Sequence, residues 1–279
     1  MSSKAIAEKA VKTEGGAVAQ YDPTMFEADQ GIGSVGMGAE DIALPFLKAL
    51  SRQDEILDDL PDARAGDILN TATMEVFKGA EGIRVIPCVY QRRFIQWAPR
   101  GEGTGAPIAI FAPEDARPKT ERDLKDNREY LVDEDGEAVD GTYIEETHQH
   151  FVLLLMPDGG VMSALVAMKS TQLKKSRKWN SMVSSRSMQG KNGAFVPPRF
   201  SHIYKLSTVA EENSKGSWHG WAIALEGPIS DIALYKRAKD FAASISKGDV
   251  AVKYEEERGG SAKAGSKPTD ESFEDDIPF

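Results

Sequence analysis

Aromatic and basic residues are interleaved in one short window of the sequence, residues 90–100, and this combination could bind unpaired nucleotides. Flat rings stack on exposed bases, while cations neutralise the phosphates. Because side chains alternate between the two faces of a strand, the adjacent Arg92 and Arg93 would give each face one guanidinium group. We predict that the aromatic and basic residues of this window contact DNA: Tyr90, Arg92, Arg93, Phe94, Trp97 and Arg100.

A second window, residues 174–204, repeats the combination and places Trp179 within a run of lysines and arginines. Phe94, Trp97 and Trp179 are predicted to stack on bases because each lies within three residues of an arginine or lysine. The alternative for each aromatic ring is an ordinary place in the core. The predicted DNA contacts of this window are Lys174, Lys175, Arg177, Lys178, Trp179, Arg186, Lys191, Arg199, Phe200 and Tyr204.

Acidic and basic residues are segregated along the chain. The net charge of −10 over 279 residues argues, taken alone, against a nucleic-acid partner. No acidic residue lies between Asp158 and Glu211, where nine residues are basic, or between Glu81 and Glu102, where four are basic. These thirteen cations, set against the net charge of −10, leave −23 for the rest of the chain. A solvated surface normally mixes both signs, so we expect an anion-binding surface.

Metal-ligating residue types occur without the spacing of a metal site. His148 and His150 would share one face of a strand, but no second pair of cysteine or histidine completes a four-ligand zinc site. Four acidic residues lie in a stretch of mixed charge that we interpret as a solvated loop: Asp123, Asp126, Glu145 and Glu146. They lack the spacing of a metal-dependent nuclease, so we expect no bound metal.

Other reactive groups have structural explanations as well. Cys88, the only cysteine, lies in an apolar run typical of a buried thiol and suits a reducing cytosol. The glycines of residues 31–38 match a dinucleotide fingerprint but lack the preceding strand that such a loop requires. No apolar run is long enough to span a membrane. We expect a cytoplasmic, non-enzymatic protein without a cofactor.

Periodicity predicts one ordered body over residues 39–254, after a disordered N-terminal arm at residues 1–38. Strands are expected at residues 67–70, 83–97, 107–111 and 143–156, with hairpins around residues 133–136 and between residues 201–209 and 217–226. Helices are expected at residues 41–51, at 164–188 and after an N-cap at Ser230. This pattern favours an α+β fold, an oligonucleotide-binding (OB)-like open β-barrel with added helices.

The C-terminal end carries the most specific motif. After a flexible linker at residues 255–269, residues 270–279 contain five acidic residues, no basic residue and a terminal Phe279. Such a tip could dock on a partner by placing Ile277 and Phe279 in apolar pockets beside a basic rim. The predicted protein-docking residues are Asp275, Asp276, Ile277, Pro278 and Phe279.

This end resembles the tip of bacterial single-stranded DNA-binding proteins, which finish in Asp-Asp-Ile-Pro-Phe, and the general layout resembles phage single-stranded DNA-binding proteins. The resemblance implies that the tip docks replication, recombination and repair proteins. It covers only five to ten residues, and the body is much longer than the bacterial domain, which puts the bacterial tetrameric assembly in doubt. The sequence leaves open whether the protein forms a homo-oligomer.

We therefore expect a sequence-independent single-stranded DNA-binding protein of phage replication, acting in the host cytoplasm. Stacking tolerates any base, so binding should be salt-sensitive and blind to sequence. One alternative is a recombination mediator or strand-annealing protein that uses the same surface. The other is a nuclease that the tail docks onto the replication machinery.

Overall fold

The computed structural model describes residues 42–99, 102, 105–123, 128–213, 216–250, 252 and 254, together with residues 26, 29, 32, 33 and 36. Contacts divide the chain into two units, Met1–Asp41 and Ile42–Phe279, and the labelled strands and helices belong to the second. The predicted linker and docking tip lie outside the described residues, as do Arg100, Asp126 and most of the N-terminal arm.

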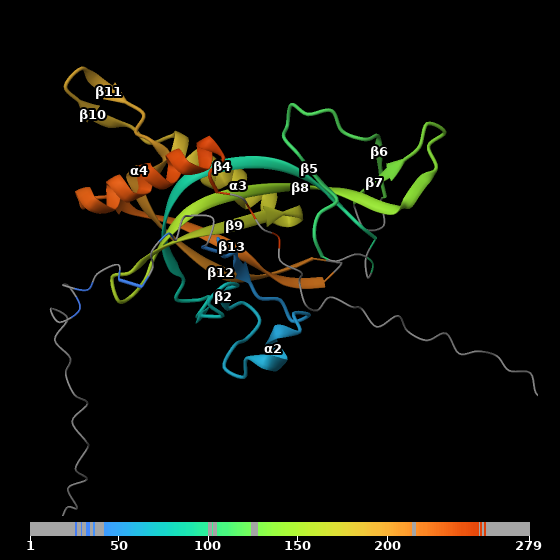
Figure 1. Ribbon diagram of the computed structural model, residues 1–279, viewed down its shortest axis with the longest axis horizontal. Helices are drawn as coiled ribbons and strands as arrows, with labels where there is room; N and C mark the ends of the chain where they lie inside the picture. Colours follow the sequence, from blue (N-terminus) through green and yellow to red (C-terminus); the bar gives the residue numbers. More distant parts are fainter. Residues whose placement is uncertain are drawn as a thin grey trace, which may run out of the picture. The chain divides into compact units, whose positions relative to one another are not determined.

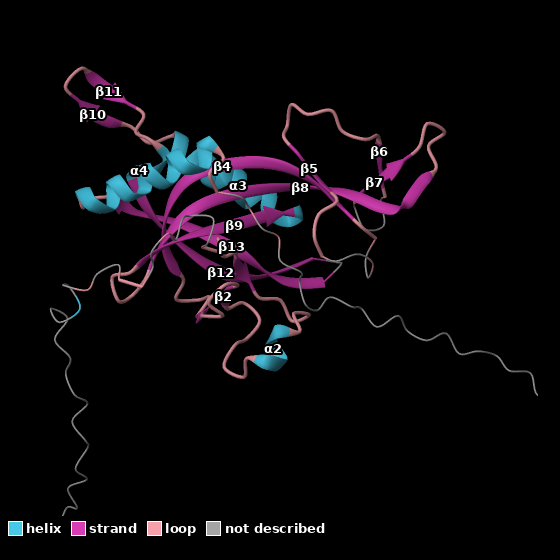
Figure 2. Ribbon diagram, viewed as in Figure 1, coloured by secondary structure: helices cyan, strands magenta, loops and turns pink. Residues whose placement is uncertain are grey.

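A large antiparallel sheet forms the body of the second unit (Figures 1 and 2). Its path runs β13-β12-β4-β8-β7-β6, while β5 pairs with β4 and β9 pairs with β8. The strands are β4 (Ile83–Trp97), β5 (Ala109–Phe111), β6 (Thr120–Arg122), β7 (Glu129–Val132), β8 (Ala138–Leu155), β9 (Val161–Lys169), β12 (His202–Asn213) and β13 (Gly216–Pro228). The protein is α+β and mainly β, with a curled sheet and few helices; the OB-like Greek-key barrel is not confirmed.

The two longest strands, β4 and β8, pair with each other and position the predicted site. Their register runs from Arg84 opposite Leu155 to Trp97 opposite Tyr143, with a bulge between Pro87 and Val89. A bulge suits this place because proline has no N–H to donate to a ladder. The predicted bounds of β4 are confirmed, whereas β8 begins five residues before the predicted residue 143.

Hydrophobic clusters cover both faces of the sheet. On one face, Trp179 of α3 (Leu173–Ser184) packs with Val152, Leu154 and Val166. On the other face, α4 (Ile232–Lys247) packs Ala238 and Ala242 against Ile86 and Leu153. Since Leu153 and Leu154 are neighbours in β8, alternation sends them to opposite faces, and both are fully buried.

Smaller elements complete the second unit. They are β1 (Leu47–Ala49), α2 (Ile56–Asp59), β2 (Ile68–Asn70), β3 (Val76–Phe77), the 3₁₀ turns η2 (Ser170–Gln172) and η3 (Arg199–Ser201), and the hairpin of β10 (Met188–Gly190) and β11 (Gly193–Phe195). Strands β1–β3 form a separate sheet, and Gly79, in the turn after β3, accepts a hydrogen bond from the Thr208 amide of β12. A Cβ at Gly79 would lie 1.8 Å from the Gly66 carbonyl oxygen, so this contact requires glycine.

Most of the predicted strands and both predicted hairpins are confirmed, but the helix predicted at residues 41–51 is wrong and the central helix is shorter than predicted. Residues 42–51 contain β1 in place of a helix, and residues 164–169 belong to β9, so the central helix begins only at Leu173. In β9, Ala164, Leu165, Val166 and Met168 are all buried, because both faces of the strand are covered, and such a continuous apolar run is also compatible with a buried helix.

The last helix is confirmed, with a correction at its first residue. Its N-cap is Asp231 rather than Ser230, because Asp231 Oδ1 accepts from the amides of Ala233 at 2.7 Å and Leu234 at 3.2 Å. At the other end, Gly248 adopts a left-handed conformation with φ of +82°, which stops the helix. Among the described residues, none of the helices has the length and apolar character needed to cross a membrane.

Candidate nucleic-acid interface

Three arginines contact Phe94 or Glu146 on one face of the β4–β8 ribbon. We name this group the Arg–Phe cluster; its members are Arg92, Phe94, Arg117, Glu146 and Arg177. The half-buried Phe94 ring lies 4.8 Å from Arg92 Cζ and 3.5 Å from Arg117 Cζ, measured from the ring centroid. At these distances a guanidinium group is attracted to the face of an aromatic ring. Arg92 comes from β4, whereas Arg117 comes from the segment between β5 and β6.

Glu146 joins the arginines of β4 and α3. Its Oε1 lies 3.0 Å from Arg92 Nε and 3.8 Å from Arg177 Nη2. The side chains of Arg92 and Arg177 are 45% and 64% exposed, while that of Glu146 is 23% exposed. Three arginines and one glutamate leave this cluster positively charged and open to solvent.

Helix α3 extends the positive surface away from the ribbon. Ser176, Trp179 and Val183 are its buried residues, spaced three and four apart as on one helical face. Lys174 and Lys178 are exposed one turn apart, on either side of Arg177 in the sequence. Lys175 instead forms an ion pair with Glu211, so α3 offers Lys174, Arg177 and Lys178 to a ligand.

Beneath the cluster, a line of four hydrogen bonds connects five buried or partly buried side chains. Ser176 Oγ lies 2.7 Å from His148 Nδ1 and 2.7 Å from His150 Nε2. His148 Nε2 lies 3.0 Å from Glu146 Oε1, and Arg199 Nη2 lies 3.1 Å from His150 Nδ1. The prediction that His148 and His150 share one strand face is therefore confirmed.

Burial lowers the pKa of both histidines. His150 is fully buried, and desolvation together with the positive Arg199 holds its pKa well below 6.5. Desolvation also lowers the pKa of His148, although Glu146 opposes this shift. The pKa of Arg199 falls to about 10 because of burial, which leaves it charged at neutral pH. Both imidazoles are therefore neutral beside a cationic guanidinium.

Two predicted site residues in β4 lie on the opposite face of the ribbon from the Arg–Phe cluster. Arg93 donates to Gln91 Oε1 at 2.7 Å and lines a groove of about 420 Å³. Trp97 packs edge-on against Tyr254, with ring centroids 5.7 Å apart and an interplanar angle of 87°. One ligand strand lying on the Phe94 face would therefore not stack on Trp97.

Trp179, predicted to stack on bases, and Tyr204, predicted to contact DNA, both belong to the core. Trp179 is 0% exposed and stacks on His150, with ring centroids 4.5 Å apart and an interplanar angle of 17°. Tyr204 is 1% exposed and packs in the same hydrophobic cluster. A base could reach neither ring unless the core opened.

The remaining predicted residues lie in several different environments. Tyr90 packs edge-on against His148, with centroids 5.3 Å apart, and Phe200 packs against Tyr235 at 5.4 Å. Arg186 donates to the Met182 carbonyl, whereas Lys191 is exposed in the β10–β11 hairpin. The structure thus brings together only part of the predicted set, mainly Arg92, Phe94 and Arg177.

Sequence reasoning missed two members of the cluster. Arg117 lies in a stretch of mixed charge, where nothing marks it as different from a solvated cation. The assignment of Glu145 and Glu146 to a solvated loop is wrong, since both lie in β8. Alternation offered a signal for Glu146, because residues 146, 148 and 150 of one strand point to the same face.

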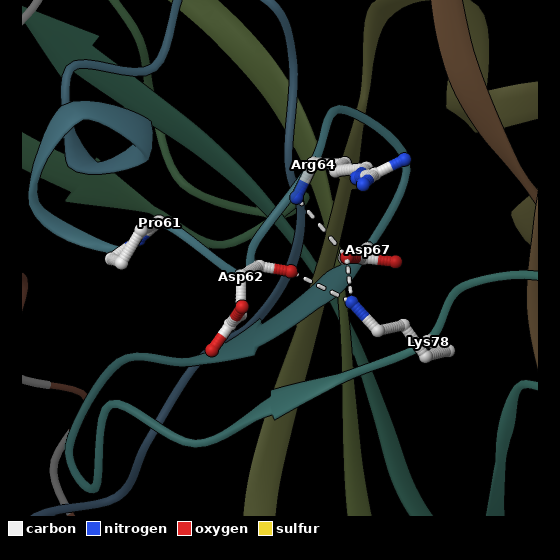
Figure 3. A pocket seen from close by; sticks show the side chains of 5 residues that line it. All are labelled: Pro61, Asp62, Arg64, Asp67 and Lys78. Atoms are coloured by element: carbon white, nitrogen blue, oxygen red, sulfur yellow. Dashed lines mark hydrogen bonds and ion pairs between the residues drawn. The ribbon is translucent and has the colours of Figure 1, made fainter.

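A second polar site, lined by Pro61, Asp62, Arg64, Asp67 and Lys78, is an open depression of about 430 Å³ (Figure 3). Burial raises the pKa of Asp67, but bonds from Lys78 and from the amides of Gly79 and Arg64 outweigh this effect and lower it. Lys78 Nζ lies 3.0 Å from Asp67 Oδ2 and 2.8 Å from the Asp62 carbonyl oxygen. The Asp67 carboxylate is already bound within its own loop, which is a structural role.

The structure also describes the surroundings of Cys88 and of the candidate metal ligands. Burial raises the pKa of the Cys88 thiol to about 12, so it stays protonated and is a poor nucleophile. Within the described residues, no three side chains of histidine, cysteine, aspartate or glutamate come together as metal ligands.

Comparison with known proteins gives one match. The family described as Pam3 phage gp34-like protein matches residues 13–251 of the chain. No curated protein and no solved structure matches it.

Proposed function

This chain belongs to the Pam3 phage gp34-like protein family, and from that premise we propose that it is a sequence-independent single-stranded DNA-binding protein of phage replication. It coats and protects single strands and recruits replication, recombination or repair proteins through residues 275–279. In this proposal the curled sheet does the work of an OB-like barrel, which holds extended strands on an open face.

The observation that carries the proposal is the Arg–Phe cluster. Phe94 offers a ring to a base, and Arg117 covers that ring with a planar group that can itself stack on a base or give way to one. Arg92 and Arg177 lie beside it with exposed guanidinium groups that can bind phosphates. Stacking and phosphate binding together favour single strands, because the bases of a duplex are not free to stack on a protein ring.

The C-terminal residues support the recruiting part of the proposal. Residues 270–279 carry five negative charges and two apolar anchors, Ile277 and Phe279. Solubility alone would need only the charges, whereas docking on a partner uses the anchors as well. The resemblance of this end to bacterial single-stranded DNA-binding proteins points to the same role.

A titration of the full chain with labelled oligonucleotides tests the proposal. We expect tight binding to a single strand of mixed sequence, weaker binding to the matching duplex, and a log–log salt slope of about −3 to −4 for ~4–6 neutralised phosphates. A salt-independent affinity or a strong preference for one duplex sequence would overturn it.

Charge variants locate the site. The double variant Arg117→Gln/Arg177→Gln should reduce the magnitude of the salt slope by about 1.4, since each single-strand phosphate contact contributes roughly 0.7. The matched control is Lys236→Gln/Lys239→Gln, which removes two exposed cations from α4. If the control variant weakens binding as much as the cluster variant, the Arg–Phe cluster is not the site.

Simple assays distinguish the two alternative functions. A recombination mediator or annealing protein would accelerate pairing of complementary strands. A nuclease would shorten labelled DNA in the presence of magnesium.

A further inference from the structure

The hydrogen-bond line between Arg199 and Glu146 has donors and acceptors that can be assigned one by one. A guanidinium group only donates, so Arg199 Nη2 at 3.1 Å requires His150 Nδ1 to be an unprotonated acceptor. The imidazole of His150 then carries its single proton on Nε2 and donates it to Ser176 Oγ at 2.7 Å. A charged His150 would point a second donor at Arg199, which its complete burial makes still less favourable.

The hydroxyl group of Ser176 continues the same donor-to-acceptor direction to His148. This hydroxyl accepts from His150 and has one hydrogen, which it donates to His148 Nδ1 at 2.7 Å. His148 therefore carries its proton on Nε2 and donates it to Glu146 Oε1 at 3.0 Å. Every hydrogen bond along the line therefore has an assigned donor and acceptor, from the guanidinium group of Arg199 at one end to the carboxylate of Glu146 at the other.

The line ends on the oxygen that gathers the surface arginines. Glu146 Oε1 accepts from His148 and also pairs with Arg92 Nε at 3.0 Å and Arg177 Nη2 at 3.8 Å. These arginines belong to β4 and α3, and no other acidic partner is recorded for either within the described part of the chain. The buried line therefore fixes the position of the one carboxylate that holds both exposed cations.

We propose that Glu146, His148 and Ser176 are positioning residues for the nucleic-acid interface, holding Arg92 and Arg177 ready for phosphates. The inference rests on the function proposed above. A long side chain that is free in solution loses rotamer freedom when it binds, and a side chain already held loses less. Hydrogen bonds of one buried network also depend on each other, so breaking one link loosens the next.

The groups facing the two histidines come from all the elements packed around them. They are Tyr90 and Arg92 of β4, Glu146 of β8, Ser176, Arg177 and Trp179 of α3, and Arg199 of η3. Glu146 is the only acid in this set, and of the two histidines it contacts His148. A neutral pair of histidines with both protons on Nε2 fits the hydrogen bonds that Glu146, Ser176 and Arg199 make with the two rings.

Long-range ¹H–¹⁵N NMR on the histidine-labelled full chain tests the proton assignment without DNA. We expect both His148 and His150 to be neutral Nε2–H tautomers at neutral pH. A charged imidazolium, or an Nδ1–H tautomer at either residue, overturns the assignment.

Binding of a labelled oligothymidylate tests the positioning role with variants that keep the charge. Glu146→Asp shortens the side chain by one methylene and should draw Oε1 away from both arginines, weakening binding about two- to tenfold with an unchanged salt slope. Glu145→Asp, on the opposite face of β8, is the matched control and should bind like the parent protein.

Ser176→Ala breaks the line in the core, at a residue that no DNA can touch. It should weaken binding by a similar factor, whereas Ser184→Ala, an exposed serine of the same helix, should not. The double variant Ser176→Ala/Glu146→Asp should lose no more affinity than either single variant, because both act through one carboxylate. Additive losses, or parent-like binding by Glu146→Asp, overturn the positioning role.

These outcomes separate the inference from the proposed function. If the parent protein binds no single strand, the proposed function fails and the positioning role fails with it, while the NMR result still decides the proton arrangement. If the parent protein binds and the variants bind equally well, only the inference fails.

Discussion

At the scale of single residues, the two sides of β4 divide the predicted DNA contacts into separate groups. Arg92 and Phe94 lie on the face that also carries Glu146, whereas Arg93 and Trp97 lie on the face with the groove beside Tyr254. Alternation along a strand makes this division unavoidable for adjacent residues. A single DNA strand can follow one face, so one aromatic residue should matter more than the other.

Phe94→Ala should weaken binding of a labelled single strand by about 1–3 kcal/mol, the usual contribution of one base stacked on an aromatic ring. Trp97→Ala, on the opposite face, should bind nearly as well as the parent protein. Fluorescence anisotropy titrations measure both, and circular dichroism checks that each variant is folded. A loss with Trp97→Ala and none with Phe94→Ala would move the interface to the other face.

The buried histidines predict how stability depends on pH. The folded-state pKa of His150 lies well below 6.5, because of desolvation first and the positive Arg199 second. Below pH 6.5 His150 is protonated in the unfolded chain but stays neutral in the folded chain. The contribution of His150 to the free energy of unfolding is therefore fully present above pH 6.5 and is lost as the pH falls. Desolvation lowers the pKa values of His148 and His202 as well, which acts in the same direction.

The free energy of unfolding should therefore fall by up to about 1.4 kcal/mol per pH unit for His150 alone as the pH drops below 6.5. Urea denaturation at several pH values measures the slope. The variant His150→Asn, which cannot gain a proton, should show a shallower slope than the parent protein. Equal slopes would mean that His150 is not the buried titrating group.

At the scale of elements, the two sides of α3 differ: one packs into the core and the other carries exposed cations. Its buried side inserts Trp179 and Val183 into the core and Ser176 into the hydrogen-bond line. Its exposed side carries Lys174, Arg177 and Lys178. The helix thus places cations next to the β4–β8 ribbon because its apolar side is fixed against the same sheet.

Trp179→Ala should destabilise the protein by about 3–5 kcal/mol, as expected for removing a fully buried large aromatic side chain. Urea denaturation measures this change. The adjacent Lys178→Ala, which removes an exposed side chain, should change stability by no more than about 0.5 kcal/mol. A stable Trp179→Ala protein with weakened DNA binding would instead restore this tryptophan to the interface.

At the scale of the whole molecule, charge segregation gives an acidic chain a positive surface. The two acid-free windows contribute β4, α3 and the turn with Arg199. The sheet brings β4 and α3 together at Glu146, although about eighty residues separate Arg92 from Arg177 in the sequence. We propose that the five acidic residues of 270–279 compete with DNA for this surface.

Deleting residues 270–279 should separate two effects. Partner binding should be lost, and single-strand affinity should stay equal or rise at low salt, because a tethered acidic segment competes with DNA at high effective concentration. The rise should fade as salt screens the charges. Anisotropy titrations at several salt concentrations, with and without the deletion, measure it.

Phe279→Ala provides the matched control for the deletion. It should nearly abolish partner binding, because a buried aromatic end group dominates so small an interface, while it keeps every charge and most of the competition. If the deletion weakens DNA binding in a folded protein, the tail is part of the DNA site.

The sequence by itself determined the features that depend on local pattern. The bounds of β4 and the hairpin of β12 and β13 were predicted, since alternation and turn residues act over a few neighbours. The buried Cys88 and the shared face of His148 and His150 followed from the same local rules. The two basic windows were also visible, because charge is a property of composition.

Only the tertiary structure decided which of these residues meet. An apolar run such as residues 164–169 fits a strand or a buried helix equally well, and pairing with β8 selects the strand. A tryptophan among lysines looks like a surface ring, yet packing against His150 places Trp179 in the core. Arg117 and Glu146 join Phe94 through contacts across the sheet, and such contacts depend on register and on long-range packing that no local pattern contains.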